Sequence, residues 1–293
     1  MEQSHISFRS LNLVSLTAGL VAAAMAFVGF QSVLKSPDTT TLVAQSAPPA
    51  GNVVWTGDME SSWNPGGDLW IWYAPASSAF GFLSNTLDTV GNGGGVFNSG
   101  TACVGPSFDF AHSGTYSAKL SIDTSHGQES GVRLFRWSEA QAIPALYYSV
   151  WYYFPQQYTP VGNPAWWNVF EWKSKSPGRN NPFFSVNVWN RPDGTMYFVL
   201  RDNNMGTTYN QTMSNIPVAQ WTRLEAFYHC AGDSSGRVTI WHDGVRLFDV
   251  PGPTRFGNGD CEWSVTNYSN GLSPNPATFY IDDAAICFGG RCP

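Results

Sequence analysis

Charged residues are scarce in this sequence. Only 12% of its 293 residues are Asp, Glu, Lys or Arg, whereas about a quarter is usual in a soluble domain. The 15 Lys and Arg residues are outnumbered by 21 Asp and Glu residues, and the basic residues do not occur in runs. Proteins that bind nucleic acids carry a basic face or stripe. The composition therefore excludes this class of function and predicts no nucleic-acid partner.

Metal-ligand spacings and long helical patterns are also missing. The five cysteines form no CxxC or Cys/His pattern, which argues against a zinc site. After the N-terminal region no long stretch has the helical period, and Gly, Pro, Asn and Ser recur between short apolar runs. This punctuation predicts an all-β domain with many turns. The hydrophobic share of 43% is ample for a buried core.

One long hydrophobic run is present, at the N-terminus. Residues 11–34 carry no charge and are long enough to span a bilayer. We interpret residues 1–35 as a hydrophobic helix that serves as a signal peptide or a membrane anchor, and residues 36–50 as a polar linker. Residues 51–293 would then form one domain that is secreted or otherwise extracytoplasmic. Its contact with a membrane would be only through the N-terminal segment.

The cysteines of an exported protein predict disulfides. Cys287 and Cys292, in the sequence CFGGRC, could close a small loop at the C-terminus. Cys230 and Cys261 could join two strands. Because the number of cysteines is odd, one must be left over.

Eleven segments after residue 106 have the composition and alternation of β-strands. Asp243-Gly244 between two alternating runs is a strong hairpin signal. Residues 145–154 are apolar or aromatic on both faces, which predicts a central strand covered on both sides. We interpret the glycine-rich residues 90–101 as a surface loop, because they lack the GK[ST] ending of a phosphate-binding loop. The pattern predicts a sandwich of two antiparallel sheets.

The segment WWNVFEWKSKS, residues 166–176, mixes aromatic and charged side chains. Strict alternation would place Trp167, Glu171 and Lys173 on one face of a strand. In the segment 183–191 the same rule groups Asn187 and Trp189. Such a face suits a sugar chain, because aromatic planes stack on pyranose rings while polar groups bind hydroxyls or carboxylates. We predict that Trp167, Asn187 and Trp189 contact a polysaccharide.

The order of these segments resembles that of polysaccharide lyases with a concanavalin-like jelly-roll fold, of the heparin-lyase and alginate- or glucuronan-lyase type. The resemblance spans residues 53–288 and includes VVWTGDMES, SGTYSAKLSID, YYSVWYYFPQQYTP and the region from NVFEWKS to RPDGTMYFVL. It implies an all-β jelly-roll sandwich of two antiparallel sheets. It also implies an extracellular enzyme that cleaves a uronic-acid-containing polysaccharide by β-elimination.

The resemblance assigns catalytic residues as well. In SVTNYSN, Tyr268 falls on the family's tyrosine that acts as base or acid, and Asn270 falls on a glutamine that would bind substrate. In EWK, Lys173 falls on a histidine position and Glu171 on a glutamine position. Arg133 in GVRLFRW is the best match to an early arginine. Glu171 departs from the family pattern, since a glutamate stands in place of a glutamine. Its carboxylate would repel a uronate unless Lys173 and Arg133 compensate its charge.

Two residues in the loop SHGQESGV precede the segment that contains Arg133. If this loop folds over the groove, His126 and Gln128 would contact the substrate, and His126 could serve as an alternative base. No cofactor is required for the predicted reaction. A structural Ca²⁺ could bind Glu60 and Asp283, because the first and last strands of jelly rolls are often neighbours and carboxylates suit this ion. We expect a monomer.

Two other functions remain open from the sequence. A non-catalytic, lectin-like carbohydrate-binding module needs only the aromatic groove, and the glutamate at position 171 favours it. A jelly-roll glycoside hydrolase needs two carboxylates that flank the bond. Glu171 has no second acid on its own strand, and Glu225 could join it only through the fold. Tyr268 and Lys173, both in place, favour the lyase.

Overall fold

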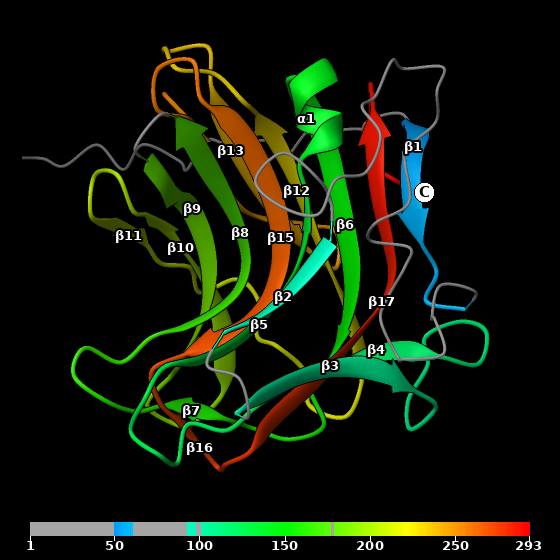
Figure 1. Cartoon of the computed structure of the whole chain (residues 1–293), viewed down its shortest axis with the longest axis vertical. Coiled ribbons are helices and arrows are strands. Elements are labelled where there is room, and N and C mark those ends of the chain that lie inside the picture. Colours follow the sequence, from blue (N-terminus) through cyan, green and yellow to red (C-terminus); the bar gives the residue numbers. More distant parts are fainter. Residues whose placement is uncertain (1–49, 61–92, 98–100, 177–178) are drawn as a thin grey trace, which may run out of the picture. The chain divides into compact units, whose positions relative to one another are not determined.

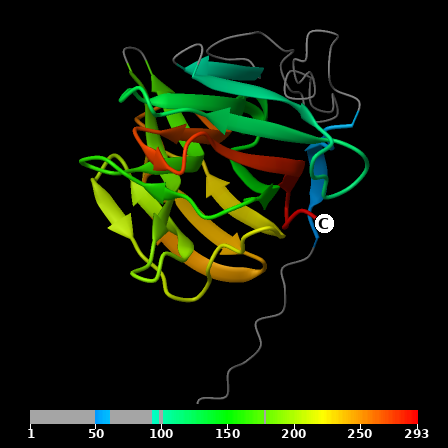
Figure 2. The ribbon, with the colours of Figure 1, turned by 90° about the horizontal axis from the view of Figure 1, so that it is seen from below.

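The computed structural model describes residues 50–60, 93–97, 101–176 and 179–293, all within one compact unit. The predicted N-terminal helix and almost all of the predicted linker, residues 1–35 and 36–50, lie outside these ranges. Within them, no helix is both long enough and apolar enough to cross a bilayer. The described residues form two antiparallel sheets packed as a sandwich (Figure 1, Figure 2).

The first sheet has eight antiparallel strands in the described part of the chain. Their order is β14-β13-β12-β6-β17-β4-β3, and β1 also pairs with β17 (Figure 1). The strand β6 thus lies inside the sheet, between β12 and β17. The bounds are β1 Asn52–Gly57, β3 Ala102–Ser107, β4 Ser117–Ile122, β6 Ala145–Tyr153, β12 Trp221–His229, β13 Arg237–His242, β14 Val245–Pro251 and β17 Ala277–Phe288.

The second sheet has seven antiparallel strands among the described residues, in the order β11-β10-β9-β8-β15-β5-β2. The bounds are β2 Gly93–Phe97, β5 Ser130–Arg136, β8 Trp167–Ser176, β9 Arg179–Asn190, β10 Met196–Asp202, β11 Thr207–Tyr209 and β15 Asp260–Ser269. A short pair of strands, β7 Thr159–Pro160 and β16 Leu272–Ser273, and one short helix, α1 Ser138–Ala142, complete the elements of the described ranges.

The eleven predicted strands are confirmed, and the structure adds further short strands such as β3, β7, β11 and β16. Each of the eleven predicted segments contains a strand, and a tight hairpin joins β13 to β14 through Asp243 and Gly244, whose φ angles are 47° and 80°. The interpretation of residues 90–101 as a loop is wrong for Gly93–Phe97, which pairs along β5 at the edge of the second sheet. A strand ladder uses only backbone groups, so glycines can form it despite their low strand propensity.

The core lies between the two sheets and is rich in aromatic residues. Trp172 of β8 stacks on Tyr228 of β12 with ring centroids 4.4 Å apart, and Trp263 of β15 contacts Tyr148 of β6 at 5.0 Å. All four side chains are buried. These contacts join the inward faces of the two sheets, because side chains that alternate along a strand point to opposite faces.

The outer face of β6 is less covered than predicted. Its inward residues, such as Tyr148, are buried, but Trp151 and Tyr153 on the opposite face are only half-buried. A loop supplies the cover that exists, with His112 stacked on Trp151 at 3.9 Å and Phe110 stacked on Tyr153 at 4.2 Å. The prediction of a strand covered on both sides is therefore correct for one face and only partly correct for the other.

Two disulfides match the predicted pairs. Cys230 follows β12 in the first sheet and bonds to Cys261 of β15 in the second, so this bridge ties the two layers together. Closing this stretch of 31 residues in the unfolded chain is expected to stabilise the fold by about 3–4 kcal/mol. Cys287 bonds to Cys292 and closes the C-terminal loop. The cysteine left over is Cys103, an exposed thiol on β3.

Candidate active site

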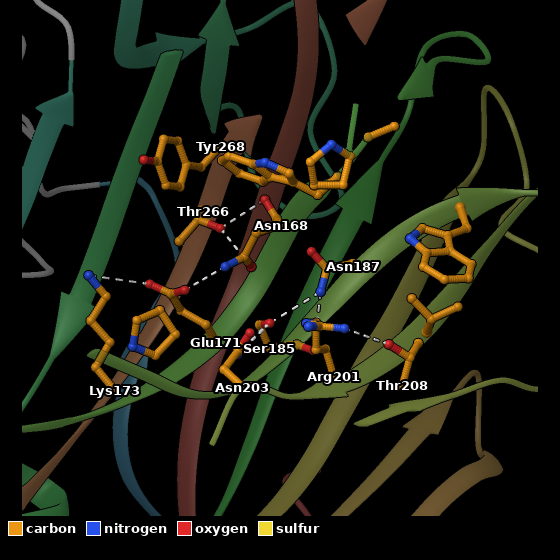
Figure 3. A pocket seen from close by; sticks show the side chains of 16 residues that line it. Asn168, Glu171, Lys173, Ser185, Asn187, Arg201, Asn203, Thr208, Thr266 and Tyr268 are labelled. Atoms are coloured by element: carbon orange, nitrogen blue, oxygen red, sulfur yellow. Dashed lines mark hydrogen bonds and ion pairs between the residues drawn. The ribbon is translucent and has the colours of Figure 1, made fainter. Parts of the chain in front are cut away.

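A groove of about 500 Å³ lies on the face of the second sheet that points away from the core. Its walls come from β8, β9, β10, β11 and β15 and from the segment that precedes β8 (Figure 3). Its lining includes the side chains of Trp166, Asn168, Glu171, Lys173, Ser185, Asn187, Trp189, Arg201, Asn203, Thr208, Thr266 and Tyr268. They combine an aromatic wall with amides, hydroxyls and ions, which is the kind of lining that a sugar chain requires.

A bulge in β8 decides which of its residues face the groove. The pairing of β8 with β9 shifts between Asn168 and Phe170, so two consecutive residues, Val169 and Phe170, are both buried in the core. The Asn168 side chain stabilises this irregularity, because its Oδ1 accepts the Phe170 N–H at 3.1 Å and the Thr266 hydroxyl at 3.1 Å. Alternation resumes beyond the bulge, and Glu171 therefore shares the groove face with Asn168.

The bulge moves Trp167 into the core. Trp167 has no exposed surface, its Nε1 donates to Asn267 Oδ1 at 2.9 Å, and its ring packs against Tyr158. The prediction that Trp167 stacks on a sugar is therefore wrong. Its neighbour Trp166 lines the groove instead. The rings of Trp166 and Tyr268 meet edge to face, with their centroids 4.8 Å apart.

Substitution of the two tryptophans separates these roles. Trp167→Ala is expected to lower the free energy of unfolding by about 3–5 kcal/mol, because it opens a cavity in the core. Trp166→Ala is expected to leave this free energy within about 1 kcal/mol and to raise KM for the polysaccharide by about 3–10-fold through lost stacking. Urea unfolding and initial rates measure the two effects. A large KM effect confined to Trp167→Ala would contradict the assignment.

Glu171 sits in a cluster of charges on the floor of the groove. Its carboxylate lies 3.7 Å from Lys173 Nζ and 3.8 Å from an Arg133 guanidinium nitrogen. It accepts hydrogen bonds from Asn168 Nδ2 and, at 3.5 Å, from the Ser264 hydroxyl. Only 4% of the Glu171 side chain is exposed. The two cations thus offset the negative charge of Glu171.

A second carboxylate, Glu262 of β15, lies behind this cluster. It is 3.0 Å from an Arg133 guanidinium nitrogen, and its side chain is only 1% exposed. Burial raises the pKa of Glu262 to about 7, although Arg133 and Lys173 act in the opposite direction. Glu262 was not among the residues predicted from the sequence. Alternation along β15 could have found it, because Glu262 has the same parity as Tyr268.

The raised pKa of Glu262 makes stability depend on pH. The folded protein binds a proton at Glu262 more tightly than the unfolded chain, so the contribution to stability is fully present at low pH and falls as pH rises through about 7. The free energy of unfolding should therefore drop by about 2–3 kcal/mol from pH 5 to pH 8 relative to a Glu262→Gln variant. Urea unfolding at several pH values measures this difference. Parallel curves for the two proteins would contradict it.

Tyr268 occupies the groove at the point where β15 pairs with β5. Its hydroxyl donates a hydrogen bond to a Glu129 carboxylate oxygen at 2.5 Å. Burial, and after it the hydrogen bond to Glu129, raises the pKa of Tyr268 well above its usual value. The phenol therefore keeps its proton at neutral pH. Glu129, like Glu262, was not predicted from the sequence.

Polar side chains of β9 and β10 line the other half of the groove (Figure 3). The predicted residues Asn187 and Trp189 are both there. The Asn187 amide donates to the Ser185 hydroxyl at 3.1 Å. Arg201, which the sequence analysis did not single out, donates to the Thr208 hydroxyl at 2.9 Å. This half thus offers amides and an additional cation to hydroxyls or carboxylates.

Three other predicted substrate contacts lie elsewhere. Asn270 follows β15, where its amide donates to the Pro164 carbonyl at 2.7 Å and its Oδ1 accepts the Trp166 N–H at 3.3 Å. It therefore positions the segment that carries Trp166. His126 and Gln128 are exposed in the turn before β5 and are not among the described residues that line the groove.

The two predicted calcium ligands are engaged with neighbouring groups. One oxygen of Glu60 accepts the backbone N–H groups of Thr115 and Tyr116, each at 2.7 Å. Asp283 accepts the Ser113 hydroxyl at 2.8 Å and contacts His112 Nδ1 at 2.6 Å. In the ranges that the structure describes, no group of three or more His, Cys, Asp or Glu side chains could hold a metal ion. Calcium binding stays a prediction.

One family model matches more than half of the chain. The family model described as polysaccharide lyase matches residues 109–285. The endo-β-1,4-glucuronan lyase from the fungus Trichoderma reesei has a similar structure, with a TM-score of 0.50 and 15% identity over 66% of this chain and 89% of that one. At this identity the likeness shows the fold alone. No sequence among curated proteins matches the chain.

Two further solved structures have lower similarity. The cellulose-induced protein Cip1 gives a TM-score of 0.46 at 11% identity, over 80% of this chain and 97% of that one. A variant of the alginate lyase Aly36B, in complex with an alginate trisaccharide, gives 0.47 at 12% identity, over 81% of this chain and 99% of that one.

Proposed function

The chain belongs to the polysaccharide lyase family, and from this premise we propose that it is an extracellular enzyme that cleaves a uronic-acid-containing polysaccharide by β-elimination. The observation that carries the proposal is a single groove that contains a protonated tyrosine, Tyr268, and a cation, Lys173, with a second cation, Arg133, next to its floor. Each group answers one requirement of the reaction.

The reaction requires a proton to move between two atoms of a uronic acid. The proton at C5 leaves from the carbon next to the carboxylate, and the oxygen on C4 departs. Negative charge builds on the carboxylate as the C5–H bond breaks, so cations close to it stabilise the transition state. A side chain within hydrogen-bond reach must take the proton, and an acid must supply one to the leaving oxygen.

The groove residues fit these roles. Tyr268 transfers the proton, because its hydroxyl is the acid–base group that lines the groove beside the cations. Lys173 lines the groove and neutralises the substrate carboxylate. The same ammonium group also pairs with Glu171. Arg133 lies between Glu171 and Glu262 and offsets part of their negative charge. Trp166 supplies the stacking surface.

The two alternative functions are less well supported. A glycoside hydrolase would need a partner for Glu171, but Glu225 lies in β12 of the other sheet and pairs with Arg291, whose Nε is 3.0 Å away. Glu262 is near Glu171 but does not line the groove. A lectin-like module is favoured by one observation. Glu171 already pairs with both cations, Arg133 and Lys173, which the lyase reaction would need for the substrate carboxylate. Turnover therefore has to be tested directly.

The test is a panel of polysaccharides. The protein is incubated with alginate, glucuronan, heparin, pectate and hyaluronan, with and without Ca²⁺, and ultraviolet absorbance follows the new C4–C5 double bond. The proposal expects absorbance to rise on at least one polymer. If none responds and one of them is retarded in an affinity gel, the protein is a binding module.

A further inference from the structure

Glu129 lies at the edge of the groove, immediately before β5. Along this stretch Ser130 and Val132 are fully buried, whereas Arg133 faces the charge cluster beside Glu171. Because side chains alternate along a strand, Glu129 and Gly131 share the face of Arg133. Glu129 is itself exposed. It thus presents a carboxylate just before β5, within hydrogen-bond reach of Tyr268.

The pairing of β15 with β5 makes room for a direct contact between Tyr268 and Glu129. Tyr268 lies opposite Gly131, which has no side chain, so the phenol ring can extend across β5 to Glu129. The hydroxyl donates to the carboxylate at 2.5 Å, and Trp166 packs edge to face on the ring at 4.8 Å. The Tyr268 side chain is therefore held by two contacts, one from its hydroxyl to the Glu129 carboxylate and one from its ring to Trp166.

This geometry raises a question about proton transfer. A tyrosine that acts alone as a base must first lose its proton and become a phenolate. Here the neighbouring carboxylates Glu129 and Glu171 both oppose a negative charge on Tyr268, and Arg133 is the cation that favours it. A route in which the phenol never becomes charged avoids this cost.

We propose that Glu129 is the proton acceptor of the reaction and works through Tyr268 in a relay. The inference rests on the proposed lyase function and deepens it. The C5–H bond breaks, its proton passes to the Tyr268 oxygen, and the phenolic proton of Tyr268 passes to the Glu129 carboxylate. The electron pair left on C5 forms the C4–C5 double bond, and the C4–O4 bond breaks with its electron pair on O4.

The relay then runs in reverse. Glu129 returns its proton to Tyr268 as the phenol protonates O4, which restores an ionised Glu129 and a neutral Tyr268. The net change is one proton moved from C5 to O4 and one new double bond, so neither an oxidant nor a reductant is needed. The relay also explains why a tyrosine with a raised pKa suits this groove.

Glu129→Gln tests the relay. The amide oxygen can still accept the phenolic hydrogen bond, but it cannot take the proton. We expect kcat to fall about 10²-fold or more, while KM changes by less than about 3-fold. Glu129→Asp should recover part of kcat. A matched control is Asp233→Asn, which removes a carboxylate from the turn before β13, where it binds Ser235.

Three outcomes would overturn the inference. If Glu129→Gln keeps kcat within about 3-fold of the wild type, Glu129 only orients the ring. If Glu129→Gln does not fold, Glu129→Ala decides, and a kcat within about 3-fold of the wild type would count against the relay. If the wild-type protein makes no unsaturated product from any polymer, the lyase function itself fails, and the relay fails with it.

Discussion

Tyr268→Phe is expected to lower kcat for polysaccharide cleavage by about 10²–10⁴-fold, the usual contribution of a positioned acid–base group. The hydroxyl that the substitution removes lines the groove and donates to Glu129. The ring, which packs on Trp166, remains. Binding should persist, so KM should change by less than about 3-fold.

Initial rates of double-bond formation measure this effect. Tyr153→Phe is a matched control, because Tyr153 lies on the outer face of the other sheet and stacks on Phe110. It should keep the wild-type kcat. Activity of Tyr268→Phe within about 3-fold of the wild type would show that another group transfers the proton.

Arg133→Met is expected to lower the free energy of unfolding by about 3–5 kcal/mol at neutral pH, because removing one partner of a buried ion pair leaves an uncompensated charge. Arg133 is the cation nearest to the buried Glu262, at 3.0 Å, and it also lies 3.8 Å from Glu171. The loss should shrink at pH 5, where Glu262, whose pKa is raised to about 7, is protonated and neutral.

A double substitution identifies the cause. Arg133→Met combined with Glu262→Gln should recover most of the lost stability, because it removes the buried charge together with its partner. Arg246→Met, at an exposed salt bridge to Asp249, should change the free energy of unfolding by less than about 0.5 kcal/mol. Urea unfolding followed by tryptophan fluorescence measures all three. A loss below about 1 kcal/mol for Arg133→Met would contradict the charge cluster.

Most strands could be predicted because one simple rule governs them. Where a strand has one face in the core, apolar residues alternate with polar ones, and all eleven predicted segments contain a strand. The rule does not reach Gly93–Phe97, which pairs through its backbone and has almost no side chains to form a pattern. It also says little about what covers the outer face of β6, because the cover comes from a distant loop with His112.

The candidate site divides in the same way. Asn187 and Trp189 lie in the groove because β9 alternates regularly there, and Tyr268 lies there because β15 does. Trp167 was misplaced because a single bulge reverses the parity of the residues before it, and no residue type marks a bulge in the sequence. Glu129 acts through a contact across two strands, which depends on register and cannot be read from one segment.

The central claim is that the groove carries out β-elimination on a polyuronide, and the mass of the products tests it most directly. The polymer that responds in the absorbance assay is digested, and the oligosaccharides are analysed by mass spectrometry. Elimination predicts products that lack one water relative to the hydrolytic oligosaccharides of the same length, formed by the wild type and not by Tyr268→Phe. Products with the mass of hydrolytic oligosaccharides would contradict the account.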